Sequence, residues 1–67
     1  MTTYSKVKQT FLDLKSAKAT LEQYALIAGE ENARSFREIA RKMEPTLQRL
    51  DRRIRSMEFE EPQYRGS

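Results

Sequence analysis

The residues of this chain whose types and spacing most suggest a binding function are the arginines of one short segment, "RLDRRIR" at residues 49–55. Arg49, Arg52, Arg53 and Arg55 lie within seven residues, and residues 34–55 hold eight cationic against three anionic side chains. Arginines on a helix can contact phosphates, and such binding weakens steeply with salt. Against this, residues 49–55 contain no aromatic ring for base stacking, and most arginine-rich helix faces are simply solvated. The segment therefore predicts, as an alternative interpretation only, a face that binds nucleic acid or an anionic membrane surface.

Other chemistry is poorly supported by the composition. The chain has no cysteine and no histidine, which removes disulfides, thiolate nucleophiles, imidazole bases and the usual zinc ligands. The serines therefore lack a histidine base, and two glycines are too few for a phosphate-binding loop. Lys18 is the one polar residue on an otherwise apolar stripe, and we expect its long stem to carry the amine to the edge. We expect no enzyme and no catalytic, cofactor-binding or metal-binding residue.

These side chains must be positioned by two helical segments. The first carries apolar residues at steps of three and four, a helical period that strand alternation does not fit. Its stripe consists of Tyr4, Val7, Phe11, Leu14, Leu21, Ala25 and Ala28. Thr2 or Thr3 is suited to cap its start. Gly29 is the natural stop, because glycine can take the left-handed conformation that closes many helices.

The second segment is more regular and contains a proline. Its stripe runs without a slip through Ala33, Phe36, Ala40, Met43, Leu47, Leu50, Ile54 and Met57. An interior proline removes one backbone hydrogen bond and usually kinks or breaks a helix. Because the apolar register continues across Pro45, we predict one kinked helix and keep two separate helices as the alternative.

A short connection makes the two helices antiparallel neighbours. We therefore predict an all-α fold, an antiparallel αα-hairpin forming a single domain over 1–67, with helices at about 3–28 and 31–60 and a tail at 61–67. A core of this size rarely supplies more than about 3–5 kcal/mol of stability. Leu12, Leu26 and Ile39 would stay exposed in a monomer, which favours a homodimer forming a four-helix bundle. The predicted dimer core is Phe11, Leu14, Leu21, Phe36, Met43, Leu47, Leu50 and Ile54.

The closing segment, "EFEEPQYRGS", has two interpretations. In an antiparallel hairpin, Phe59 and Tyr64 come within reach of Tyr4 and Val7, and the acidic residues around them face Lys6 and Lys8. Pro62 should stop the helix, because the residue before a proline is pushed out of helical geometry. The simpler interpretation is a helix stop with a docked tyrosine. The functional one is a partner-recognition tail that uses Glu61, Pro62 and Tyr64.

No apolar run approaches the roughly 20 residues of a membrane span, and the N-terminus lacks a charged-then-apolar signal segment. We therefore expect a soluble, cytoplasmic protein. The formal net charge of +3 is modest, so the distribution of charge matters more than its sum.

Three stretches carry a resemblance: "LKSAKATLEQ" in the first helix, "ARKMEPTLQRLDRRI" in the second, and the closing "EEPQY". Over nearly its whole length the chain resembles domain-of-unknown-function family 1657, small proteins of endospore-forming Firmicutes associated with gene clusters for stage V sporulation A-type channel components. The resemblance implies a sporulation-associated accessory protein in the forespore or spore, and it supplies no catalytic residue. The basic "RLDRRIR" departs from the family pattern.

Together these patterns favour a non-catalytic structural or interaction module, an adaptor whose partners are a second copy and a spore membrane protein. The competing hypothesis is the small anionic-polymer binder, with nucleic acid or a membrane surface as its weaker-supported partners and no cofactor.

Overall fold

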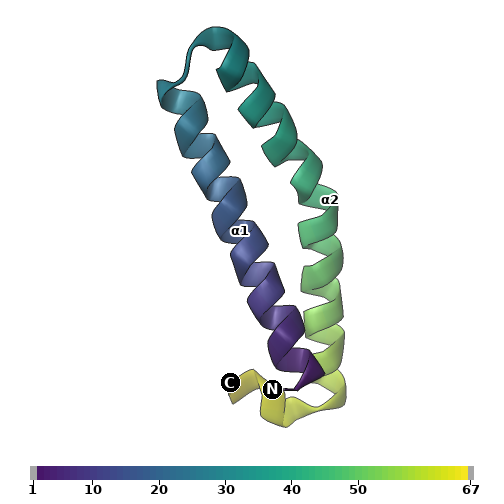
Figure 1. Cartoon of the computed structure of the whole chain (residues 1–67). Helices are drawn as coiled ribbons and strands as arrows, with labels where there is room; N and C mark the ends of the chain where they lie inside the picture. The colour runs from purple at the N-terminus through teal and green to yellow at the C-terminus, as the bar shows by residue number, and fades with distance from the viewer. Residues whose placement is uncertain (1, 67) are drawn as a thin grey trace.

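The computed structural model describes residues 2–66, and side chains as far as residue 64. Helix α1 spans Thr3–Ile27, helix α2 spans Glu30–Glu60, and a short 3-10 turn, η1, spans Pro62–Gly66. The two helices run antiparallel, and η1 folds back beneath the end of the hairpin near the N-terminus (Figure 1). The chain is therefore an all-α hairpin, with helix bounds within one residue of those expected. Ser67 of the expected tail lies outside the described residues.

Helix α1 begins with a side-chain cap. The Thr2 hydroxyl oxygen accepts a hydrogen bond from the Ser5 backbone N–H at 3.0 Å, while the Thr2 carbonyl accepts from Lys6 N–H at 3.1 Å. Capping satisfies a backbone donor that the first turn of any helix leaves without an intrahelical partner. Of the two threonines expected to cap α1, Thr2 is the one that does so.

The turn between the helices corrects one expectation. Gly29 has φ −60° and ψ 158°, and Ala28 is similarly extended, so the prediction of a left-handed glycine is wrong. Ala28 N–H still bonds the Tyr24 carbonyl at 2.9 Å, and Ala33 N–H already bonds the Gly29 carbonyl at 2.8 Å. The helices are therefore joined by two extended residues. Gly29 is the N-cap residue of α2, a position at which glycine is common.

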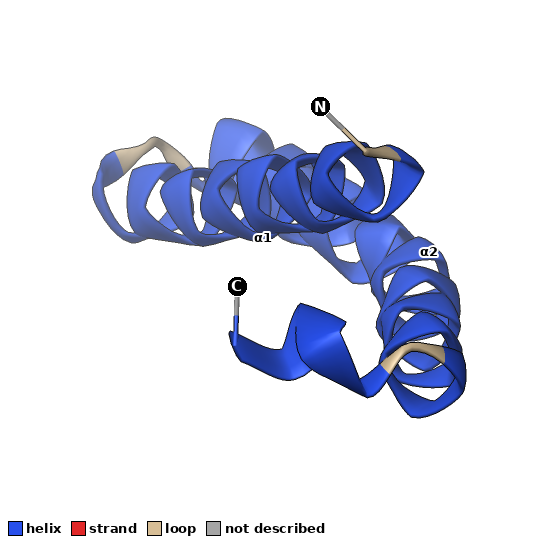
Figure 2. Ribbon diagram, turned by 90° about the horizontal axis from the view of Figure 1, so that it is seen from below, coloured by secondary structure: helices blue, strands red, loops and turns tan. Residues whose placement is uncertain are grey.

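Helix α2 continues through Pro45 without a break. Both Pro45 and Arg41, whose carbonyl loses its partner at this point, are exposed, so water can satisfy that carbonyl. Figures 1 and 2 show α2 changing direction along its length instead of lying straight against α1. A single bent helix is what the uninterrupted apolar register predicts.

Burial follows heptad columns along both helices. In α2, every seventh residue from Ala33 to Ile54 is buried, and the column three residues further on is half-buried throughout. In α1, the buried residues are Tyr4 at 1% exposure and Ala25 at 6%. Much of the buried contact therefore comes from alanines, which let the helix backbones approach but remove little apolar area from water.

The resulting molecule is elongated and carries a large surface. It measures 46 × 18 × 15 Å, and its radius of gyration of 14.9 Å exceeds the roughly 11 Å of a compact chain of this length. Its accessible area is 5319 Å², against about 4,400 Å² for a typical folded monomer of this mass. A single hairpin thus leaves about 900 Å² more surface in water than a folded chain of this size normally does.

Candidate interaction surfaces

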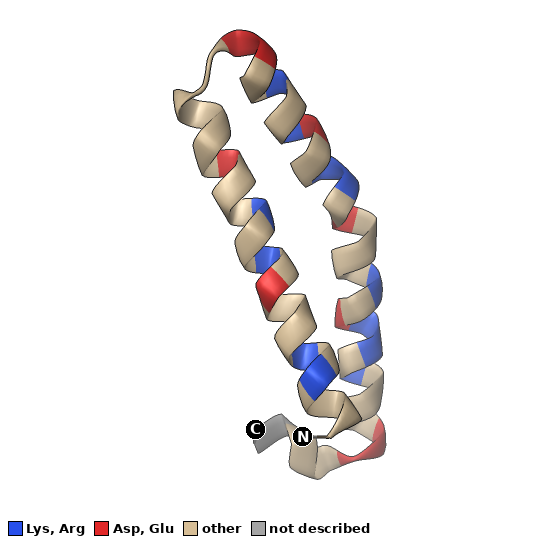
Figure 3. Ribbon diagram, in the orientation of Figure 1, with Lys and Arg blue, Asp and Glu red and all other residues tan. Residues whose placement is uncertain are grey.

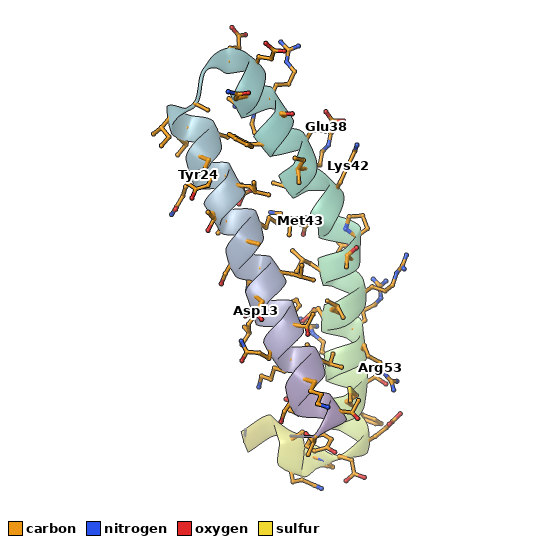
Figure 4. The ribbon with its side chains drawn as sticks, in the orientation of Figure 1. Asp13, Tyr24, Glu38, Lys42, Met43 and Arg53 are labelled. Atoms are coloured by element: carbon orange, nitrogen blue, oxygen red, sulfur yellow. The ribbon has the colours of Figure 1, made fainter. Side chains whose placement is uncertain are left out.

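One broad side of the hairpin is apolar along its whole length. It is formed by the half-buried columns of the two helices, which we call the apolar face: Val7, Leu14, Leu21, Ala28, Phe36, Met43, Leu50 and Met57. Helical geometry puts both columns on the same side, because the rotation sense reverses between antiparallel helices. Met43 points toward α1 in Figure 4, so this column closes the hairpin seam from one side.

An exposed column flanks the apolar face on each helix. On α1 it consists of Thr3, Thr10, Ala17 and Tyr24, and on α2 of Asn32, Ile39, Thr46 and Arg53. Ile39 is 48% and Tyr24 51% exposed, and the Tyr24 ring lies 6.2 Å from that of Phe36. Across the face and both flanks, Arg53 is the one charged side chain. A surface of this breadth with so little charge is unusual for a free helix pair.

The eight residues of the predicted dimer core fall into three places. Leu47 and Ile54 are buried inside the hairpin at 7% exposure each. Phe11 lines a groove on the opposite side of the molecule. The remaining five, Leu14, Leu21, Phe36, Met43 and Leu50, belong to the apolar face. Two residues expected to stay exposed, Leu12 and Leu26, do so at 46% and 84%, but helical geometry places them on the groove side, away from Ile39.

The opposite side, which we call the groove face, is charged. Its groove of about 470 Å³ is lined by Phe11, Lys15, Lys18, Ala19, Glu22, Glu44, Leu47, Gln48, Asp51 and Arg55. Cationic and anionic side chains are equal in number there, and several pair with one another. Arg55 Nε lies 3.2 Å from Asp51 Oδ2, and Lys15 Nζ lies over the Phe11 ring at 5.7 Å. A groove whose charges are internally matched offers little net attraction to a charged ligand.

Lys18 lies at the centre of this pairing. Its Nζ is 3.2 Å from Glu22 Oε2 and 3.3 Å from Glu44 Oε2, which ties α1 to α2. Its side chain is 22% exposed, whereas both carboxylates are about half exposed. The hydrogen bonds that Lys18 donates to Glu22, the larger effect, and to Glu44 raise the pKa of Lys18 above its ordinary value of 10.5. The one polar residue on the α1 stripe is therefore an interhelical ion-pair centre at the edge of the core.

The four arginines of the predicted anion-binding face do not share one side of α2. Arg55 pairs with Asp51 on the groove face, while Arg53 points away from α1 beside the apolar face (Figure 4). Arg49 and Arg52 lie between them on the outer side of the helix. A tighter group lies further up α2, where Arg34, Arg37 and Arg41 line a shallow hollow with Glu38.

That upper arginine group was missed as a cluster at the level of sequence, although its i, i+3, i+7 spacing is the signal that could have found it. The cationic residues of α2 lie between residues 34 and 55, whereas its acidic residues lie at both ends of the helix and at Glu38, Glu44 and Asp51 (Figure 3).

The C-terminal turn is docked against the N-terminal end of α1. The Tyr4 hydroxyl donates to Glu58 Oε2 at 2.6 Å, and the rings of Tyr4 and Tyr64 stack with centroids 4.3 Å apart and planes 6° from parallel. Lys8 Nζ lies 5.5 Å from the Tyr4 centroid. The hydrogen bond to Glu58, together with burial, raises the pKa of Tyr4 above its ordinary value of 10.0, partly opposed by Lys8.

This docking matches the interpretation of Tyr64 as a tyrosine that returns to Tyr4, and it corrects the placement of Phe59, which is 79% exposed. Phe59 follows Met57 by two residues, a step of about 200° around the helix, which turns its ring away from the core. Pro62 opens η1, and Glu61, just before it, has left helical geometry with φ −131° and ψ 83°. Glu61 and Pro62 are both exposed, so the predicted recognition tail is anchored mainly through Tyr64.

Among residues 2–66, no group of three or more acidic, histidine or cysteine side chains is arranged to hold a metal ion. Within those residues, neither helix combines the length and the apolar character that crossing a bilayer requires.

The model of a family described as "Protein of unknown function (DUF1657)" matches residues 7–54, which include most of α1 and α2 and end before the docked tail. No curated protein and no solved structure matches the chain.

Proposed function

The chain belongs to the DUF1657 family of proteins of unknown function, and we propose that it is a non-catalytic interaction module that acts as a homodimer. In the dimer the apolar faces of two hairpins pack against each other and form a four-helix bundle. The second copy supplies the cover that one hairpin of this size lacks.

The observation that carries this proposal is the apolar face itself. Its eight residues are half-buried in one chain, so they are neither solvated like a surface nor removed from water like a core. The surplus area of about 900 Å² per chain is close to the roughly 800 Å² that each partner buries in a standard protein interface. Internal ion pairs on the groove face make that side the one left to solvent.

The proposal is tested by sedimentation equilibrium at micromolar concentration, comparing the wild-type chain with Leu50→Glu and Leu12→Glu. Leu50 lies on the apolar face, so a carboxylate there would be buried without a partner, and we expect the dimer to weaken at least about 100-fold. The helical circular dichroism signal should fall with it, because the free hairpin is marginal.

Leu12→Glu introduces the same charge on the groove side, where Leu12 is already 46% exposed, and should leave both the mass and the helical signal unchanged. A wild-type chain that sediments as a well-folded monomer would overturn the proposal. So would equal effects of the two substitutions.

For the cellular role we propose an accessory or adaptor associated with sporulation, working in the cytoplasm or forespore beside a spore membrane protein. The support is the sequence resemblance over "LKSAKATLEQ" and "EEPQY" together with the family match. Affinity purification of the tagged chain from sporulating cells should recover a membrane protein that the Leu50→Glu variant does not recover. Recovery of the same proteins by both variants would argue against an adaptor that needs its dimeric form.

A second candidate is an anion-binding surface on α2. Six arginines, Arg34, Arg37, Arg41, Arg49, Arg52 and Arg53, have no carboxylate within ion-pair distance in the described part of the chain, whereas Lys42 and Arg55 do. Titrating labelled duplex DNA, and separately anionic vesicles, at low and moderate salt tests it. Failure to bind either one at low salt would eliminate this candidate.

A further inference from the structure

We infer that the two copies pack with both interhelical turns at the same end of the bundle, so that α1 of each copy lies against α2 of the other. This inference rests on the proposed homodimer and fixes how the second copy is oriented. The alternative is an opposite-end arrangement, in which α1 packs on α1 and α2 on α2.

The hairpin itself fixes the register of the same-end arrangement. Contacts between Tyr24 and Phe36, and between Lys18 and Glu44, place residues level with each other when their numbers total about 61. A two-fold axis parallel to the helices does not shift levels along them. Each residue of α1 therefore faces, in the partner, the same level of α2 that it faces in its own chain.

At this register, small side chains meet large ones across the interface. The exposed column of α1 meets the half-buried column of the partner's α2, which pairs Thr3, Thr10, Ala17 and Tyr24 with Met57, Leu50, Met43 and Phe36 of the partner subunit. In three of these four layers a threonine or alanine opposes a methionine or leucine. Alternation of small and large residues across facing positions is what lets layers interdigitate at native density.

The second pair of columns is more mixed in side-chain size. The half-buried column of α1 meets the exposed column of the partner's α2, so that Val7, Leu14, Leu21 and Ala28 oppose Arg53, Thr46, Ile39 and Asn32 of the partner subunit. Leu14 thus faces a threonine, and Leu21 faces Ile39, which is 48% exposed in the single chain. Arg53 falls at the end of the face, where its head can reach solvent.

The opposite-end arrangement distributes side-chain volume less evenly between the two seams. Each helix there also faces an antiparallel copy, so the exposed column of α1 meets the half-buried column of the partner's α1, a seam built mostly of threonine, alanine, valine and leucine, while the larger methionine, leucine and phenylalanine side chains of both α2 helices share the other seam. The opposite-end arrangement would also align the cationic outer side of α2 with that of its partner. Residues 34–55 carry eight cations against three anions, so this alignment adds like-charge repulsion that the same-end arrangement avoids.

The orientation can be measured with a single spin label per chain, because the protein contains no cysteine of its own. Gly29→Cys places the label in the turn, where a side-chain Cβ meets nothing within 4 Å and no positive φ is required. Double electron–electron resonance should give a separation below about 25 Å, because adjacent bundle helices lie only about 10 Å apart. Turns at opposite ends would instead lie apart by most of the 46 Å length.

The matched control is Gln48→Cys, at mid-length on the groove face, whose separation should be similar in either arrangement. A dimer in which the Gln48→Cys distance matches the thickness of the bundle and the Gly29→Cys distance is near the molecular length would overturn this inference and leave the proposed homodimer standing. A wild-type monomer in sedimentation would overturn both.

A packing variant gives an independent readout. Ala17 is exposed in the single hairpin, so the larger side chain of Ala17→Leu meets no crowding within one chain. In the same-end dimer the added bulk meets Met43 of the partner subunit, and we expect the dissociation constant to rise at least about tenfold. A tighter dimer would instead indicate that Ala17 faces the less crowded α1 seam of the opposite-end arrangement.

Discussion

Tyr4 is the residue at which the two ends of the chain meet. Its hydroxyl donates to Glu58 at 2.6 Å, its ring stacks on Tyr64, and it is 1% exposed. A hydroxyl that donates to a carboxylate is stabilised in its protonated form, which is why the pKa of Tyr4 is raised. The N-terminal turn of α1 is thereby tied to both the end of α2 and the docked tail.

This hydrogen bond makes the stability of the fold sensitive to alkaline pH. A folded-state pKa above the unfolded value means that the contribution is complete below about pH 10 and is lost as pH rises through the raised pKa. We expect Tyr4→Phe to melt several degrees lower than wild type at pH 7, and the gap to shrink above pH 10. Circular dichroism melts between pH 7 and 11 measure this, with Tyr24→Phe, half exposed, as the matched control. A gap independent of pH would show that the hydroxyl bond does not contribute.

The contribution of the Tyr4–Tyr64 stack to stability can be distinguished from that of an exposed aromatic ring nearby in the sequence. Tyr64→Ala removes the ring that covers Tyr4, and we expect it to lower the free energy of unfolding by about 1–2 kcal/mol. Phe59→Ala removes an equally large ring from a site that is 79% exposed, so its effect should stay within about 0.5 kcal/mol. Urea titration of both variants makes the comparison. Equal losses would mean that η1 is not specifically docked.

At the scale of elements, the sequence of the turn is compatible with two conformations of Gly29: a left-handed residue that closes α1, or an extended residue that begins α2. A left-handed closing glycine would make any side chain at that position costly. Gly29 instead has an ordinary extended conformation at the start of α2, where Glu30 and Glu31 follow it in the first turn. Negative side chains there suit the positive end of the helix dipole.

Gly29→Ser should therefore stabilise the protein by about 0.5–1 kcal/mol, because serine can cap α2 and restricts the unfolded chain. Gly29→Ala shares the entropic part without the cap, so its gain should be smaller. Chemical denaturation of the two variants checks the ranking. Destabilisation by both would indicate a left-handed residue after all.

Helix α2 shows how an apolar register tolerates a proline. Pro45 lies on the exposed side, so its ring and the released carbonyl of Arg41 disturb neither the buried column nor the half-buried one. The bend of α2 is visible in Figure 2. A proline on the inner side of the same helix would interrupt the interhelical packing.

At the scale of the whole molecule, shape and surface decide the expected behaviour. The hairpin is long and thin, and its buried residues include three alanines, so hydrophobic stabilisation per chain is small. Folding and association should therefore be coupled, as they are in many small obligate dimers.

Coupling predicts a melting temperature that depends on concentration. For two 67-residue chains unfolding together, a tenfold rise in protein concentration should raise the melting temperature by about 5 °C. Circular dichroism melts from about 1 to 100 μM measure this directly. The Leu12→Glu variant should retain the dependence, whereas a constant melting temperature in the wild type would contradict coupled folding.

The amino-acid sequence by itself determined the elements of this protein and their pairing. Stripes of period 3.6 select helices, and a connection of a few residues leaves only an antiparallel neighbour, so the all-α hairpin, its helix bounds and the return of Tyr64 to Tyr4 follow from local rules. Pro45 could be judged in the same way, because the register on either side of it is visible in the sequence.

Only the tertiary structure decided which side of each helix packs inside the hairpin, which side forms the apolar face and which side forms the groove face. Periodicity shows that an apolar stripe is broad, but how far the helices rotate about their own axes depends on contacts between residues distant in sequence. That rotation placed Leu12 and Leu26 on the groove side, away from Ile39, and made Lys18 the partner of Glu44. It also gathered the charge-poor residues on one side, because the buried alanine columns draw the two backbones together and leave the neighbouring columns half covered.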